Sequence, residues 1–185
     1  MKEDKKTRVC PVEVAGGLDN SFRKLVQNPQ KILKPFINPN SNVLDLGCGP
    51  GFFSVEIAKM LKGSAKVIAA DLQQGMLDKV KKKIEGTELE NKISLHKCLG
   101  NSINLNEKVD FVLAFYMVHE VPDKEHFFKE LKSILNANSS VLIVEPKFHV
   151  SKQDFENMLE ITKRYGFRIQ KEPKFLLSRS VLLCN

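Results

Sequence analysis

The sequence predicts an α/β protein built as a three-layer sandwich, in which helices cover both faces of a mostly parallel sheet. Short runs rich in Val, Ile and Leu alternate along the chain with segments whose apolar residues recur at helical spacing. The first of these runs leads directly into a glycine-rich turn and a helix, as expected of a βα connection. At 185 residues, the chain suits one core of ordinary domain size.

The first predicted strand, 43–46, is followed by Gly47, Gly49 and Gly51 at alternate positions. Glycine lets the main chain take unusual dihedral angles and lie close to a ligand. The helix expected after the turn presents unpaired N–H groups and a positive dipole end, which favour a carboxylate or a phosphate. The glycine spacing matches neither the dinucleotide fingerprint nor the phosphate loop, so both of those nucleotide sites are disfavoured.

The second predicted strand, 66–71, ends in Asp71. A carboxylate at this position can accept hydrogen bonds from both hydroxyls of a ribose, and the alternative is a cap for the helix over 76–84. The nearly continuous apolar run 109–115 is typical of a central parallel strand covered on both faces. Further elements are predicted as strands 93–98, 141–145, 167–169 and 180–184, and as helices 53–61, 127–135 and 151–166.

Composition and charge exclude several classes of protein. The net charge is +7, but the lysines are dispersed and are not interleaved with aromatic residues, which disfavours nucleic acid as a partner. No apolar run approaches the roughly 20 residues of a membrane span, and the first residues lack the apolar core of a signal peptide. The four cysteines are scattered, without the spacing of a zinc site or a disulfide framework. We expect a cytoplasmic protein with reduced thiols, no metal and no membrane partner.

The segment from Asp45 to Gly51, Asp-Leu-Gly-Cys-Gly-Pro-Gly, resembles the first motif of class I S-adenosylmethionine-dependent methyltransferases. The segment 116–123 after the fourth strand is similar to the His-x-Val-Pro-Asp stretch of small-molecule methyltransferases, including quinone-biosynthesis and arsenite types. The resemblance spans roughly residues 41–185. It implies a mostly parallel, seven-stranded Rossmann-like sheet that is closed by an antiparallel hairpin.

The resemblance also implies a binding site for S-adenosylmethionine, whose product is S-adenosylhomocysteine. Asp45 would hold the amino group of the cofactor through water, and Asp71 would bind its ribose. Asn101 stands where the family usually has an aspartate that accepts from the adenine amino group, and its side-chain carbonyl can accept the same bond. The implied cofactor residues are Asp45, Gly47, Gly49, Gly51, Asp71, Leu72, Met76 and Asn101, of which Leu72 and Met76 could equally be core residues.

Methyl transfer from a sulfonium is an in-line displacement, which requires alignment and exclusion of water rather than a metal. His119 is the candidate base because its ordinary pKa is near 6.5 and its loop should face the ligand crevice, although a structural role is the alternative. Tyr116 and Glu120 would position the acceptor, and Glu145 is a further candidate.

We therefore expect a methyltransferase domain over 41–185 that acts on a small-molecule acceptor. The alternatives are an RNA or protein methyltransferase, suggested by the basic charge, and a non-catalytic protein that binds S-adenosylmethionine. Residues 1–40 are predicted to form a helical leader, which either covers the site as a lid or extends the core. The acceptor and the oligomeric state stay open.

Overall fold

The structure is a computed structural model and describes residues 28–185. Most of the predicted leader therefore lies outside the described residues, and its role as a lid stays a prediction. The leader's last part forms the short helix α3 (Pro29–Leu33), which begins where the Asn28 side chain accepts a hydrogen bond from the N–H of Lys31 at 3.1 Å.

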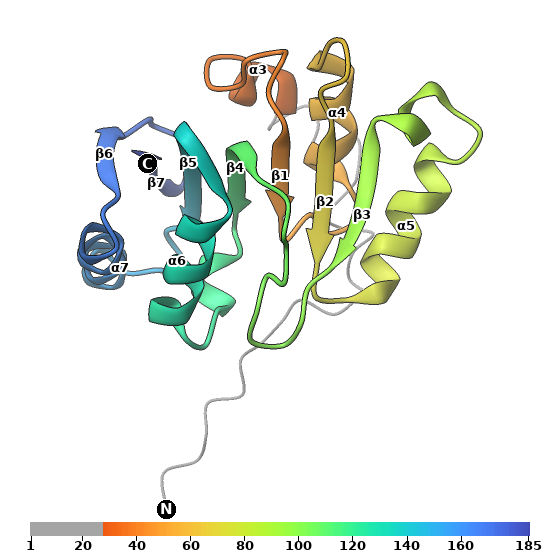
Figure 1. The fold of residues 1–185 in the computed structure, drawn as a ribbon. Coiled ribbons are helices and arrows are strands. Elements are labelled where there is room, and N and C mark those ends of the chain that lie inside the picture. Colours follow the sequence, from red (N-terminus) through yellow and green to blue (C-terminus); the bar gives the residue numbers. More distant parts are fainter. Residues whose placement is uncertain (1–27) are drawn as a thin grey trace, which may run out of the picture.

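The described strands form a seven-stranded sheet in the order β3-β2-β1-β4-β5-β7-β6 (Figure 1). The first five strands along the chain are parallel, whereas β7 runs antiparallel to both of its neighbours, β5 and β6. The predicted mostly parallel sheet with an antiparallel closing hairpin is thus confirmed. The strands are β1 (Val43–Leu46), β2 (Val67–Asp71), β3 (Ile93–Lys97), β4 (Val109–Phe115), β5 (Leu135–Pro146), β6 (Arg168–Lys171) and β7 (Ser178–Cys184).

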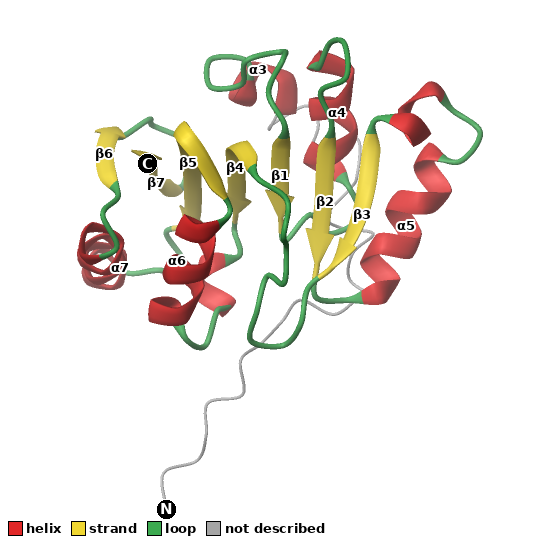
Figure 2. Ribbon diagram, viewed as in Figure 1, coloured by secondary structure: helices red, strands yellow, loops and turns green. Residues whose placement is uncertain are grey.

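Helices cover both faces of the sheet and complete the predicted three layers (Figure 2). On one face, α3, α4 and α5 share a buried apolar cluster with the sheet. On the other face, α6 and α7 share a second cluster with it. The remaining helices are α4 (Phe52–Met60), α5 (Gln74–Ile84), α6 (Lys124–Ser133) and α7 (Lys152–Arg164), with 3-10 turns η2 (Glu88–Asn91) and η3 (Val118–Glu120).

Strand β4 lies at the centre of the sheet because its side chains are apolar on both faces. Phe111 and Leu113 belong to the cluster under α4, and Val112 and Ala114 belong to the cluster under α6. All four are at most 2% exposed. Because β4 is buried on both faces, its sequence is an almost unbroken apolar run.

Strand β5 differs most from its prediction. The sequence predicts a helix through residue 135 and a strand over 141–145, but α6 ends at Ser133 and β5 begins at Leu135. The polar residues between the predicted helix and the predicted strand belong to β5, and the register of the β4–β5 pair shifts along them. Val109 faces Leu135, whereas Phe111 faces Ser140. Asn138 adopts a positive φ of 62° inside this stretch. A strand of this kind lacks the apolar alternation by which strands are recognised.

The order of the strands determines where a ligand can bind. From β1 the chain moves outward to β2 and β3, and it then returns to the other side of β1 for β4 and β5. The loops that follow β1 and β4 therefore diverge and leave a crevice at the carboxyl end of the sheet.

Candidate functional site

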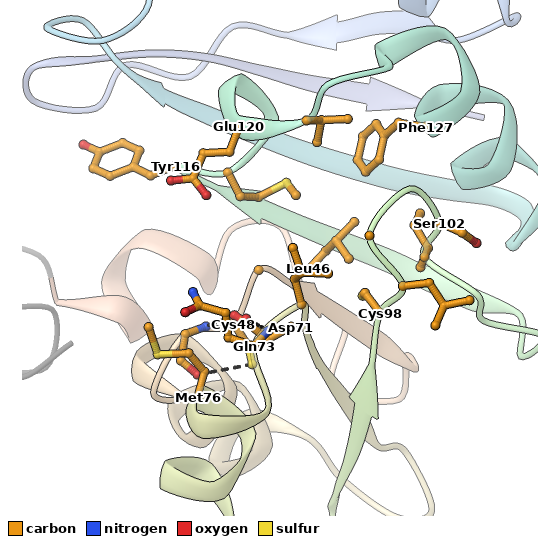
Figure 3. A pocket seen from close by; sticks show the side chains of 18 of the residues that line it. Leu46, Cys48, Asp71, Gln73, Met76, Cys98, Ser102, Tyr116, Glu120 and Phe127 are labelled. Atoms are coloured by element: carbon orange, nitrogen blue, oxygen red, sulfur yellow. Dashed lines mark hydrogen bonds between the residues drawn. The ribbon is translucent and has the colours of Figure 1, made fainter. Parts of the chain in front are cut away.

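A cavity of about 250 Å³ opens at the carboxyl ends of the parallel strands. Its walls come from the loops after β1, β2, β3 and β4 and from the start of α6 (Figure 3). The predicted site residues that line the cavity are Gly47, Gly49, Asp71, Leu72, Met76, Asn101, Tyr116 and Glu120. The predicted site residues outside its lining are Asp45, Gly51, His119 and Glu145.

The three glycines of the first loop all have positive φ, yet they are required for different reasons. A Cβ on Gly47 would lie 2.8 Å from the Cβ of Met117, and a Cβ on Gly51 would lie 3.0 Å from a methyl group of Val80. A Cβ on Gly49 would meet no atom within 4 Å. Glycine at position 47 therefore lets the loop after β4 approach closely, and glycine at position 51 does the same for α5, whereas Gly49 borders open space where a ligand can approach.

Asp71 joins the loop after β1 to the loop after β2. One carboxylate oxygen accepts from the N–H of Gly49 at 2.9 Å, and the other accepts from the N–H of Gln73 at 2.8 Å. Burial raises the pKa of Asp71, against the opposing effect of these backbone hydrogen bonds. Asp71 is only 7% exposed and lies in the cavity wall, so its carboxylate can both hold the loops and accept further hydrogen bonds.

Asp45 lies beneath the glycine loop and not in the cavity wall. It is 2% exposed and accepts a hydrogen bond from the hydroxyl of Ser54 at 2.5 Å, which fixes the first turn of α4 against β1. Lys83 of α5 donates to the carbonyl of Pro50 and holds the outer side of the same loop. The proposed contact between Asp45 and a cofactor amino group stays a prediction.

The loop after β3 forms another wall and carries Asn101. Leu99 and Ser102 close it with reciprocal backbone hydrogen bonds of 2.9 and 3.3 Å. Glu130 of α6 accepts from the hydroxyl of Ser102 at 2.6 Å and from the N–H groups of Ile103 and Asn104 at 2.8 and 2.7 Å. The position of this loop therefore depends on one carboxylate from a distant helix.

Sequence reasoning missed Glu130. Its partners lie 26 to 28 residues away along the chain, so no local pattern marks it. Partial burial would raise the pKa of Glu130, but its hydrogen bonds to Ser102, Asn104 and Ile103 outweigh burial, and the pKa lies below its ordinary value.

Residues 116–123 form the wall opposite the glycine loop. Figure 3 shows Tyr116 and Glu120 on one side of the cavity, and Asp71, Gln73 and Met76 on the other. Tyr116 has a positive φ of 62°, which is uncommon for a bulky residue. Its N–H donates to the carbonyl of Val144 at 2.8 Å, and its hydroxyl lies 2.6 Å from that of Ser178.

His119 points behind this wall toward Glu145 at the end of β5. Its Nδ1 lies 2.5 Å from one oxygen of Glu145, whose other oxygen accepts from the N–H of Val118 at 2.8 Å. The imidazole also stacks on His149, with ring centres 5.5 Å apart. Burial would lower the pKa of His119, but the hydrogen bond and charge of Glu145 outweigh burial and raise it. A role as the base stays a prediction.

The cavity is acidic although the chain as a whole is basic. Its described lining includes four carboxylates and no lysine, arginine or histidine, the carboxylates being those of Asp71, Glu120, Asp123 and Glu130. Such a lining favours a ligand with positive charge.

Two free thiols, Cys48 and Cys98, also line the cavity. Burial raises the pKa of Cys48 well above its ordinary value and that of Cys98 to about 12, so both thiols are protonated at neutral pH. Within residues 28–185, no cluster of three or more His, Cys, Asp or Glu side chains is arranged to hold a metal ion. None of the described helices has the length and apolar character to cross a membrane.

A family model for a methyltransferase domain matches residues 43–138. The demethylmenaquinone methyltransferase of Lactobacillus johnsonii is 31% identical over 132 residues, which are 70% of this chain and 51% of that protein. A Bacillus cereus demethylmenaquinone methyltransferase is 28% identical over 59% of this chain and 46% of its own length. The chain thus spans about half the length of the curated relatives it matches.

Two solved structures share the fold over nearly the whole chain. An S-adenosylmethionine-dependent methyltransferase from Aquifex aeolicus is 25% identical with a TM-score of 0.83, covering 95% of this chain and 99% of its own. The magnesium protoporphyrin IX methyltransferase of Synechocystis, solved with bound S-adenosylmethionine, is 19% identical with a TM-score of 0.67, covering 96% of this chain and 85% of its own.

Proposed function

The chain belongs to the class I S-adenosylmethionine-dependent methyltransferases, and on that premise we propose that it transfers the methyl group of S-adenosylmethionine to a small-molecule acceptor by in-line displacement. The main support for the proposal is the position of the cavity and the residues in its walls. It lies at the carboxyl edge of the sheet, and Asp71 and Gly49 are hydrogen-bonded to each other in one wall, with Tyr116 and Glu120 in the opposite wall.

The described residues fit the cofactor at three points. Open space beside Gly49 leaves room for the methionine part, whose carboxylate suits the N-terminus of α4. Asp71 is placed to accept from the ribose hydroxyls, and Met76, Leu72 and Asn101 border the space proposed for the adenine. The acidic lining suits the positive sulfonium and ammonium groups. When bound, S-adenosylmethionine supplies an electrophilic methyl group.

The residues opposite the cofactor side would bind and orient the acceptor. Glu120 lines the cavity and can accept a hydrogen bond or a proton from the acceptor, so we propose it as the group nearest the acceptor. His119 lies behind it, and we propose that its hydrogen bond to Glu145 positions the loop that carries Glu120. Tyr116 and Met117 would exclude water from the reacting atoms.

We propose a neutral or cationic acceptor with apolar character. The cavity walls include Phe53, Phe115 and Phe127, and the absence of cationic side chains from the described lining disfavours a phosphate-bearing acceptor such as RNA. The names of the curated relatives indicate demethylmenaquinone as their acceptor. Phenols and hydroquinones are therefore the first acceptors to screen.

Calorimetric titration with S-adenosylmethionine and S-adenosylhomocysteine tests the cofactor site. We expect micromolar binding by the wild type. Asp71→Asn should weaken binding at least about tenfold, because an amide cannot accept at both ends as the carboxylate does. Asp78→Asn, an exposed change on the neighbouring helix, is the matched control and should leave affinity unchanged. A wild type that binds neither compound would contradict the proposal.

Turnover separates the enzyme from a non-catalytic binding protein. Formation of S-adenosylhomocysteine is measured with a panel of phenols, hydroquinones, amines and thiols. We expect turnover with at least one member, and Glu120→Gln should lower kcat while the affinity for S-adenosylhomocysteine stays within about twofold. Cofactor binding without turnover on any member would favour the non-catalytic alternative.

A further inference from the structure

An apolar patch is exposed beside the cavity. Its members are Phe148, Leu176 and Leu177, which are 71%, 75% and 64% exposed and are the most exposed large hydrophobic residues in the described part of the chain. They come from two loops, 147–150 after β5 and 172–177 before β7. The N–H of Lys147 donates to the carbonyl of Leu177 at 3.0 Å, so the loops are joined where they leave the sheet.

The patch adjoins the acceptor wall of the cavity at two contacts. The hydroxyl of Tyr116 lies 2.6 Å from that of Ser178, the residue after Leu177. The ring of His119 stacks on that of His149, the residue after Phe148. Both loops therefore lie at the carboxyl end of the sheet, next to the wall that we propose binds the acceptor.

The backbone of the second loop holds its leucines outward. Phe175 turns inward and its ring contacts that of Phe36 at 6.4 Å between centres. Leu177 has a positive φ of 55°, a conformation that a bulky residue rarely adopts. The hydroxyl of Ser178 donates to the carbonyl of Leu176 at 3.0 Å, and that of Ser180 donates to the carbonyl of Pro173. Phe175 therefore packs against the protein, while Leu176 and Leu177 stay exposed.

Basic residues flank the members of the patch along the chain. Lys147, Lys171 and Lys174 are exposed in or next to the two loops, together with the partly exposed Arg179, and Glu172 is the exposed acidic residue of these segments. Apolar side chains at loop tips with lysines around them match an anionic lipid surface, because the tips enter the interface while the cations meet the headgroups. A continuous apolar face of larger area would be expected for a stable protein partner.

We propose that Phe148, Leu176 and Leu177 dock the protein peripherally on an anionic lipid bilayer. This revises the sequence-based expectation of no membrane partner. If the proposed function holds, an apolar acceptor can then pass from the lipid to the cavity entrance without crossing bulk water. The sequence alone does not reveal the surface, because its two loops are brought together by the pairing of β5 with β7.

Sedimentation of the full chain with lipid vesicles tests the proposal. We expect binding to vesicles of 70% phosphatidylcholine and 30% phosphatidylglycerol, weak binding to pure phosphatidylcholine, and loss of binding at high salt. The double variant Phe148→Ser/Leu177→Gly should lower the partition coefficient about tenfold or more. Glycine at position 177 accepts the positive φ, so the loop is expected to keep its fold.

Ile169→Ser on the edge strand β6 is the matched control, since Ile169 is 39% exposed and lies outside the two loops. It should bind vesicles as the wild type does. Absence of wild-type binding to the anionic vesicles, or an equal loss in the control, would overturn the proposal. So would a wild-type dimer in light scattering that the double variant dissociates, because a second copy would then cover the patch. Cofactor titration of the same samples reports separately on the methyltransferase site.

Discussion

Gly47 and Gly49 share a left-handed backbone conformation but face different surroundings. Alanine in that conformation costs about 1–2 kcal/mol. In Gly49→Ala the new methyl group would enter open space at the cavity, so we expect that modest loss of unfolding free energy and at least about tenfold weaker binding of S-adenosylmethionine. In Gly47→Ala the new Cβ would also lie 2.8 Å from that of Met117, and the stability loss should rise to about 2–5 kcal/mol.

Urea unfolding and calorimetric titration of both variants check this contrast. Met117→Gly in the Gly47→Ala background would remove both the Cβ and the Cγ that approach the new methyl group, and it should recover part of the lost stability. Equal stability losses in the two glycine variants would show that the approach of Met117 is not what requires glycine at position 47.

His119 gives stability a pH dependence whose sign follows from its raised pKa. A histidine bound more strongly as a cation in the folded state contributes its full stabilisation below its ordinary pKa near 6.5. That contribution is lost as pH rises through the higher pKa of the folded protein. Glu145→Gln removes the charge that raises this pKa, so we expect a lower pKa for His119 and a smaller decline of stability over this window.

Proton NMR of the His119 ring and urea unfolding across the same pH range measure the two effects. Glu125→Gln, which removes a surface pairing with Arg164, is the control and should leave the His119 titration unchanged. A pKa for His119 that Glu145→Gln does not move would contradict the assigned cause.

Among the elements, α6 has two roles at the site, because it lines the cavity and also holds the loop after β3 in position. Glu130 holds Ser102, Ile103 and Asn104 through three hydrogen bonds, and Asn104 takes a positive φ of 54° within that arrangement. Glu130→Gln places an amide NH₂ group against backbone donors. We expect a loss of about 1–3 kcal/mol of unfolding free energy, because a donor is left without an acceptor.

The same substitution should weaken cofactor binding through the loop that carries Asn101. We expect a greater loss of affinity for S-adenosylhomocysteine than for homocysteine, because the displaced loop faces the proposed adenine position. Titrations of both compounds into Glu130→Gln and Glu125→Gln separate this effect from general destabilisation. Equal losses for the two compounds would indicate that Glu130 acts on the fold alone.

Elements with strong local signals could be predicted from the sequence. The strand 109–115 is confirmed residue for residue. The predicted helix 151–166 is confirmed as α7, which begins after Ser151, whose hydroxyl accepts from the N–H of Asp154 at 3.1 Å. The start of β5 could not be predicted, since Leu135 becomes a strand residue only by pairing with Val109. Local patterns therefore failed where pairing between distant segments decides the structure.

The candidate site also contains residues that local patterns could predict and residues that they could not. The glycine motif and Asp71 lie in one βα unit and the start of the next, and their mutual contact follows from the parallel pairing of β1 with β2. Glu130 was not predicted, and the orientation of His119 toward Glu145 could not be foreseen, because each depends on contacts between elements that no sequence motif links. The residues proposed for the cofactor could therefore be brought together from the sequence better than those proposed for the acceptor.

At the scale of the whole molecule, the site is a gap between two halves of the sheet that are joined through β1 and β4. The loops after β1 and β2 are joined by Asp71. The loop after β3 is hydrogen-bonded to Glu130 of α6, and the loop after β4 leads to that helix. A ligand that bridges both walls would contact loops from each half. We therefore expect cofactor binding to stabilise the folded chain as a whole, and not only the residues it touches.

The magnitude follows from linkage. A ligand at one hundred times its Kd stabilises the folded state by about 2.7 kcal/mol, and a protein of this size gains about 2–4 °C in Tm for each kcal/mol. S-adenosylhomocysteine at that excess should raise the Tm of the wild type by about 5–11 °C. At the same ligand concentration Asp71→Asn should gain much less, whereas Asp78→Asn should match the wild type. Circular dichroism melts provide the measurement, and an unchanged wild-type Tm at millimolar ligand would contradict binding in the cavity.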